Sequence, residues 1–154
     1  AVRGIARAEY SSAMASKSTK LDHLQAVPLF EGCSRRELQS IARAGDEVTM
    51  TAGTVVVEQG QLGREAFIVL DGRVSVKRGG RKIVTLGPGT VVGELSLLDH
   101  GPRTATVVCD SDCTLYVIDQ RHFRGVIEQS PAIAMKLLAT LASNIRNLDR
   151  QYYG

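Results

Sequence analysis

A carboxylate and a guanidinium, Glu94 and Arg103, stand nine residues apart in a segment that is otherwise mainly apolar or small. Arginine presents a planar fork of N–H donors that can hold an anion through two parallel hydrogen bonds, which lysine cannot do. An ionised carboxylate only accepts hydrogen bonds, so Glu94 suits a hydroxyl group and not a second anion. Arg103 would also offset nearby negative charges that could not otherwise share a dry pocket.

The residues between the two charges have types that can position them. Leu95 to Leu98 suits one short helical turn, and the start of a helix offers free backbone N–H groups to an anion. Ser96 is small, which allows close approach to the backbone. A Gly101-Pro102 corner then precedes a small-residue strand start, Thr104 to Val107.

The whole run from Gly93 to Val107 closely resembles the phosphate-binding cassette of the cyclic nucleotide-binding domain family, of the catabolite activator and protein kinase A regulatory subunit type. The family pattern reads Gly-Glu-apolar-small-Leu-apolar, a short spacer, then Arg-small-Ala-Ser/Thr-Val. Ser96 departs slightly, since alanine or another small residue is usual there. The similarity extends over about residues 21–150, and Ile68 to Val74 resembles a strand hairpin of the family.

This resemblance implies a ligand, cyclic AMP or cyclic GMP, and a set of residues that bind it. Glu94 would bind the ribose hydroxyl and Arg103 the cyclic phosphate, helped by backbone groups of Leu95 and Ser96 and by the Thr104 hydroxyl. In the family, alanine after the arginine often accompanies cyclic AMP and threonine can favour cyclic GMP, so Thr104 leaves the base open. The expected binding residues are Gly93, Glu94, Leu95, Ser96, Arg103 and Thr104. No catalytic residue, metal or further cofactor is expected.

Composition and charge fit one domain with appendages. The 154 residues are 44% hydrophobic and 23% charged, and no apolar run approaches the roughly 18 residues that span a bilayer. The formal charge of +3 is carried by residues 1–20, while residues 21–154 hold 15 basic and 15 acidic side chains. Because the compact part has no basic excess, we expect no contact with nucleic acid. Alanine at position 1 favours a processed chain or a piece of a longer protein.

Cysteine and histidine usage argues against disulfides and metal catalysis. The three cysteines form no C-x-x-C pair, which fits a reducing cytoplasm. The expected location is therefore the cytoplasm, as a separate protein or as the cytoplasmic domain of a larger protein such as a membrane protein. The three histidines are scattered without metal-ligand spacing. An enzyme on this scaffold would also need a paired nucleophile and base, which the sequence lacks. We therefore expect a protein that is not an enzyme.

The fold class predicted is mainly β with flanking helices, as an eight-stranded jelly-roll barrel over about residues 46–119. Short β-branched runs alternate there with glycine turns, a pattern typical of sandwiches and barrels. Residues 1–20 are predicted to be a flexible or weakly helical lead-in, and 21–154 the domain. The expected strands are Glu47–Met50, Thr54–Glu58, Ala66–Leu70, Arg73–Lys77, Lys82–Leu86, Thr90–Val92, Thr104–Cys109 and Thr114–Ile118.

Helices are predicted on both sides of the barrel. Ser34 can cap a helix from Arg35 to Ala44, with Glu37 at the capping-box position. Two C-terminal helices are expected over about 121–152, and Ser130 with Pro131 suits the start of the longer one.

The longer C-terminal helix carries apolar residues at alternating steps of four and three, which is the spacing of a coiled-coil seam. This stripe has two interpretations: a helix packed on its own barrel, or a helix that pairs with a partner, such as a second copy, or closes over ligand. The residues are Ala134, Leu138, Leu141, Ile145, Leu148 and Tyr152, with Leu137 widening the stripe toward the domain.

Two functions follow as hypotheses. One is a cyclic nucleotide-binding regulatory module that relays ligand binding, allosterically, through the C-terminal helices to an effector outside this chain. The other is a non-binding structural or dimerisation module with a vestigial pocket.

Overall fold

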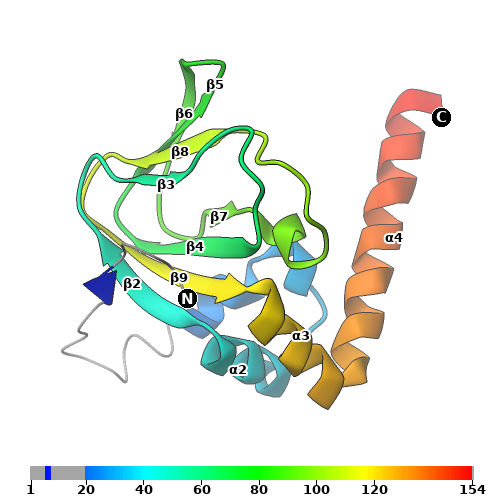
Figure 1. Cartoon of the computed structure of the whole chain (residues 1–154). Helices are drawn as coiled ribbons and strands as arrows, with labels where there is room; N and C mark the ends of the chain where they lie inside the picture. The colour runs from blue at the N-terminus through cyan, green and yellow to red at the C-terminus, as the bar shows by residue number, and fades with distance from the viewer. Residues whose placement is uncertain (1–5, 8–19, 154) are drawn as a thin grey trace.

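Two antiparallel sheets packed face to face form the body of the protein, with helices against the outer face of one of them (Figure 1). The computed structural model describes residues 6–7 and 20–153. One sheet has the order β1-β2-β9-β4-β7 and the other β3-β8-β5-β6. The strands are β1 Ala6–Arg7, β2 Asp46–Met50, β3 Val55–Val57, β4 Glu65–Asp71, β5 Val74–Arg78, β6 Arg81–Leu86, β7 Val91–Val92, β8 Thr106–Cys109 and β9 Cys113–Asp119.

The eight predicted strands are all present, and the predicted jelly-roll fold is confirmed. β1 is an addition, because Ala6 and Arg7 pair with Thr49 and Val48 of β2, where the sequence predicted a flexible or weakly helical lead-in. The unpaired backbone groups of an edge strand accept such a partner readily. Residues 1–5 and 8–19 of the predicted lead-in lie outside the described residues.

Two apolar clusters lie on opposite faces of β4 and β9. Successive side chains of a strand point to opposite faces, so the run Ala66–Leu70 in β4 contributes to both clusters. Phe67 and Val69 pack between the sheets, and Ile68 packs under the helices. This explains why β4 is apolar from Ala66 to Leu70 instead of alternating with polar residues.

Of the helices that cover the cluster containing Ile68, α2 and α4 begin at the predicted residues, and α3 begins one residue before the predicted start. Residues 20–25 are helical, followed by η1 Pro28–Phe30, α2 Arg35–Ala44, α3 Gln120–Gln129 and α4 Pro131–Tyr153. The capping box of α2 is formed, because Ser34 Oγ accepts from Glu37 N at 3.2 Å and Glu37 Oε1 accepts from Ser34 N at 2.7 Å. Asp119 caps α3 by accepting from His122 N at 2.7 Å.

Only the first part of α4 packs on the domain. Ile133 and Leu137 are 0% and 2% exposed, and α4 contacts η1 and α3. Every residue from 142 to 150 is exposed, including Ile145. The buried residues Ile133 and Leu137 stand one position before Ala134 and Leu138, so α4 packs on the domain along a row beside the predicted stripe. Leu138, Ile145 and Leu148 of the stripe are exposed, and their pairing with a partner stays a prediction. No helix in the described part of the chain is both long and apolar enough to cross a membrane.

Candidate functional site

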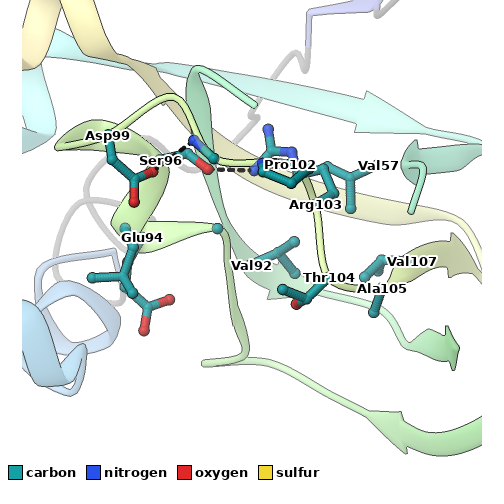
Figure 2. A pocket seen from close by; sticks show the side chains of 13 residues that line it. Val57, Val92, Glu94, Ser96, Asp99, Pro102, Arg103, Thr104, Ala105 and Val107 are labelled. Atoms are coloured by element: carbon teal, nitrogen blue, oxygen red, sulfur yellow. Dashed lines mark hydrogen bonds between the residues drawn. The ribbon is translucent and has the colours of Figure 1, made fainter. Parts of the chain in front are cut away.

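A cavity of about 290 Å³ opens between β7, η2 Glu94–Leu97 and the segment that leads into β8 (Figure 2). All six residues predicted to bind ligand lie in its wall, so the fold brings them together. The lining residues are Val57, Val92, Gly93, Glu94, Leu95, Ser96, Asp99, Gly101, Pro102, Arg103, Thr104, Ala105 and Val107.

Backbone hydrogen bonds to the loop between β3 and β4 hold Arg103 in place. Arg103 N donates to Gln61 O at 2.8 Å, and Gly60 N donates to Arg103 O at 2.9 Å. Leu62 and Pro102 form an isolated bridge beside them. β8 therefore begins at Thr106 and not at the predicted Thr104, because the preceding residues pair with this loop instead of with a strand.

Two glycines make room for the Arg103 guanidinium. A Cβ atom on Gly63 would overlap Cζ and Nε of Arg103, and one on Gly93 would overlap Nη1. Gly93 also has a φ of 73°, in the left-handed region that favours glycine, where it begins η2. The guanidinium occupies this space and donates from Nη1 to Ser96 Oγ at 3.0 Å.

Among residues 6–7 and 20–153, no carboxylate forms an ion pair with the half-buried Arg103 side chain. Burial lowers the pKa of Arg103, and the nearby Glu65 opposes that shift. Burial raises the pKa of Glu65, against the pull of Arg103, and Glu65 Oε2 is buried with no hydrogen-bond partner among the described residues. The Phe67 ring centroid lies 6.0 Å from Arg103 Cζ. Since Ser96 Oγ is the acceptor that the described residues provide, most of the five N–H donors stay open to an anion.

Glu94 lies on another side of the cavity from Arg103. The two charged groups are well separated in Figure 2. Glu94 is only partly exposed and forms no ion pair with Arg103. One part of the cavity thus has a cationic donor and another has a carboxylate acceptor, which suits a ligand with an anionic group and a hydroxyl group.

The short helix η2 orients Ser96 toward Arg103. Ser96 is 7% exposed, whereas Leu95 is 52% exposed and contributes its backbone and an apolar edge. Ser96 N donates to Gly93 O at 2.9 Å, so this N–H is already paired. The N–H groups of Glu94 and Leu95 begin η2 and have no acceptor within it.

Thr104 is exposed in the cavity wall, and a hydrogen bond from β5 anchors its backbone. Arg78 Nε of β5 donates to the backbone oxygen of Thr104 at 3.3 Å. This hydrogen bond does not involve the threonine hydroxyl. The sequence predicted a ligand contact through the Thr104 hydroxyl, and that contact stays a prediction. The choice between adenine and guanine as the base of the ligand is likewise open.

Sequence reasoning missed Gly63, in the loop before β4, and Glu65, the first residue of β4. Gly63 and Glu65 stand 40 and 38 positions before Arg103, and no local spacing connects them. The Glu65 carboxylate directly precedes the apolar run Ala66–Leu70, and this is the signal that could have marked it. The cassette residues line the cavity, and the loop before β4 positions Arg103 through backbone hydrogen bonds and through the space at Gly63.

The three cysteines belong to the two apolar clusters and do not line the cavity. The thiols of Cys33, Cys109 and Cys113 are free and buried. Burial raises the pKa of Cys33, and it raises that of Cys109 to about 12, which suppresses the reactive thiolate. Across residues 6–7 and 20–153, no three His, Cys, Asp or Glu side chains gather closely enough to hold a metal ion.

Comparisons with known proteins identify the family. The model of the cyclic nucleotide-binding domain family matches residues 47–130. The chain is 32% identical over 131 residues to the cyclic AMP receptor protein of Thermus thermophilus, which is 82% of this chain and 61% of that protein. It is 37% identical over 109 residues to a cyclic nucleotide-gated potassium channel of Mesorhizobium japonicum, which is 71% of this chain and 30% of the channel.

A solved structure agrees with these sequence matches. The N-terminal domain of a transcriptional regulator from Streptomyces coelicolor superposes with a TM-score of 0.78 at 28% identity, covering 84% of this chain and 96% of that one. The chain belongs to the cyclic nucleotide-binding domain family, and the resemblance drawn from residues 93–107 is confirmed. The chain spans less than two thirds of the length of these two relatives.

Proposed function

We propose that this chain is a non-catalytic regulatory module whose cavity binds a cyclic nucleotide, cyclic AMP or cyclic GMP. The observation that carries the proposal is the half-buried Arg103 guanidinium, seated between Gly63 and Gly93 with most of its donors open. A buried cation without a charged partner is unfavourable, and a phosphate of the ligand would relieve that penalty. Glu94, on another side of the cavity, has a carboxylate that can accept a hydrogen bond from a ribose hydroxyl.

In this proposal each polar group has one role. Arg103 binds the cyclic phosphate, and the N–H groups of Glu94 and Leu95 assist at the start of η2. The Glu94 carboxylate accepts a hydrogen bond from the ribose 2′-hydroxyl. Ser96 holds the guanidinium in place through its hydroxyl instead of offering its own N–H, which Gly93 O occupies. Thr104 faces the remaining space, where the base would lie.

Titration calorimetry of the whole chain with cyclic AMP and with cyclic GMP tests the proposal. Loss of a buried charge partner typically costs about 2 to 5 kcal/mol, so Arg103→Ala should weaken binding by roughly thirtyfold to several thousandfold. Arg36→Ala, on the exposed face of α2, removes the same charge and should leave affinity within about twofold. Equal affinities in wild type and Arg103→Ala would refute the assignment. Absence of binding by the wild type would favour the vestigial pocket.

We further propose that ligand binding is relayed to an effector outside this chain through α3 and α4. α3 contacts η2 on one side and α4 on the other, so a shift of η2 has a continuous path of packed elements to the C-terminal helix. The exposed far part of α4 has few contacts to oppose a new position. The module would act in the cytoplasm, alone or as part of a larger protein such as the matched channel.

Hydrogen exchange with and without nucleotide tests the relay. Amides of residues 131–150 should exchange more slowly with ligand, together with those of 93–107, while β5 and β6 should change less. Protection confined to residues 93–107 would contradict the relay and leave the binding proposal intact.

A second proposed role, pairing of α4 with a second copy of the chain, rests on its exposed apolar row. Leu138, Ile145 and Leu148 are 58%, 60% and 53% exposed on a helix that is otherwise amphipathic. Sedimentation equilibrium should detect a dimer that Ile145→Asp disrupts and Met135→Asp, outside the seam, preserves. A monomer at all concentrations would exclude this role.

A further inference from the structure

The hairpin of β5 and β6 concentrates positive charge on a projecting arm. Figure 1 shows it extending beyond the two-sheet body, away from the helices. Its tip is the run Lys77-Arg78-Gly79-Gly80-Arg81-Lys82, in which Gly79 and Gly80 have φ of 61° and 78°. Two glycines in the left-handed region make a tight turn, which brings the basic residues of both strands together.

The basic side chains at this tip face one another across the hairpin. Lys77 is paired in register with Lys82, and Arg78 with Arg81. Like charges directly opposite one another destabilise a strand pair. No described carboxylate lies within salt-bridge distance of these four side chains. The repulsion is therefore a property of the isolated chain that an anionic partner would relieve.

The sequence around the tip contains no compensating acid. Between Asp71 and Glu94 there is no aspartate or glutamate, whereas this interval contains five basic residues. The domain as a whole is balanced, since residues 21–154, the hairpin included, hold 15 basic and 15 acidic side chains. The positive charge on the arm is therefore a local arrangement and not part of a generally basic protein.

An aliphatic side chain accompanies the charges. Ile83 is 55% exposed, and the register jumps from Val76↔Val84 to Lys77↔Lys82, so Ile83 is the unpaired residue of a bulge. A bulge and charged residues on an edge strand discourage the addition of a further strand. The arm is accordingly poorly suited to an extended acidic peptide, and its partner must accept both cations and an aliphatic group.

We propose that the β5–β6 hairpin docks on the surface of an anionic phospholipid bilayer. Lipid phosphates would bind the four cations, and Ile83 would enter the boundary between headgroups and acyl chains. A nucleic acid offers anions but little place for an exposed isoleucine without base stacking, and the hairpin tip has no aromatic residue. Each basic residue near an anionic membrane contributes about a fivefold change in partitioning, so binding is reversible and salt-sensitive.

The arm is fixed relative to the ligand cavity. Arg78 Nε donates to Thr104 O at 3.3 Å, and Gly79 N donates to Gln59 Oε1 at 2.9 Å. Docking would therefore set the orientation of the domain on the membrane. For the same reason Arg78 is unsuitable for a test, because its removal would also disturb the cavity wall.

Flotation of the whole chain with lipid vesicles tests the proposal. The chain should bind vesicles containing about one quarter phosphatidylglycerol and not pure phosphatidylcholine, with binding lost as salt rises. Arg81→Gln/Lys82→Gln should lower partitioning about 25-fold, following the figure of about fivefold for each charge. Arg35→Gln/Arg36→Gln on α2 makes the same change in net charge at exposed residues elsewhere and should alter it less than about threefold.

A second pair of variants tests the aliphatic contact. Ile83→Ser should weaken partitioning severalfold, whereas Val55→Ser, at a residue of β3 that is 52% exposed, should not. The proposal is overturned if the wild type does not bind anionic vesicles at low salt. It is also overturned if the α2 variant and the hairpin variant lose binding equally. It is also overturned if a labelled DNA duplex, and not vesicles, shows the dependence on Arg81 and Lys82.

Discussion

The Arg103 end of the cavity and the far half of α4 differ in how completely the chain holds them. Arg103 is fixed through its backbone by the loop before β4, through its guanidinium by Ser96, and through shape by Gly63 and Gly93. Residues 142–150 of α4 are exposed along their whole length. The contacts of Arg103 select one position of its side chain. Residues 142–150 have few contacts that would select one position of the helix.

This difference separates recognition from response. A site that is already formed loses little conformational entropy when ligand arrives, which favours affinity. A segment with few buried contacts changes position for a small free energy, which suits a moving part. The predictions below test that division in order of expected effect.

The two parts of α4 should differ most in their contribution to stability. Ile133 is fully buried, so Ile133→Ala should lower the free energy of unfolding by about 2 to 5 kcal/mol. Ile145 is 60% exposed, and Ile145→Ala should change it by less than about 0.5 kcal/mol. Urea denaturation of both variants measures the contrast. Similar losses would mean that the far half of α4 is packed in solution.

Glu94 should distinguish ribose from deoxyribose. A hydrogen bond to a charged group contributes about 1.5 to 3 kcal/mol, so the 2′-deoxy analogue should bind wild type at least about tenfold more weakly. In Glu94→Ala that difference should nearly vanish, because the acceptor is gone. Calorimetry of both ligands with both proteins completes the double-mutant cycle. An equal penalty in the two proteins would show that another group contacts the sugar.

Gly63→Ala should weaken nucleotide binding while leaving the fold intact. The added methyl group would displace the flexible end of Arg103 from its seat, and a misplaced phosphate contact should reduce affinity by about tenfold. Gly87→Ala is the matched control, because a Cβ atom there meets open space. Both variants should melt close to wild type. A large loss of stability in Gly63→Ala alone would indicate that the loop, and not Arg103, had moved.

The smallest effect concerns the pH dependence that Glu65 contributes. Burial raises its pKa, so the folded chain keeps this proton to higher pH than the unfolded chain does. The associated stability is present below the ordinary glutamate pKa of about 4.3 and is lost as pH rises through the raised value. Glu65→Gln should remove this component, so its stability relative to wild type should increase from about pH 4 to about pH 7. A constant difference across that range would contradict the raised pKa.

The parts of the fold that local chemistry controls could be predicted from the sequence. The capping box at Ser34 and Glu37 defines the start of α2 because its two hydrogen bonds join residues three positions apart. The cassette from Gly93 to Thr104 likewise places its groups through one short helix and one corner. The strand runs were predictable because glycine turns separate them.

Features that depend on distant partners could not be predicted in this way. The periodicity of α4 shows which residues align on one face, but the packing of η1 and α3 decides that Leu137 is buried and Leu138 exposed. β1 required an open edge on β2, and the role of Gly63 required the loop before β4 to lie against Arg103. These are tertiary contacts between segments far apart in the chain.

One carboxylate oxygen links the start of α2 to the docking of α4. Glu37 Oε1 accepts from Ser34 N at 2.7 Å and also from Lys136 Nζ of α4. The lysine is the largest cause that lowers the pKa of Glu37, followed by the Ser34 backbone N–H. If the first turns of α4 leave the domain, this pKa rises toward its ordinary value while the cap stays in place. The pKa of Glu37, measured from its carboxyl resonance by NMR during an acid titration, therefore reports whether the first turns of α4 are packed on the domain. This measurement requires no probe attached to the helix.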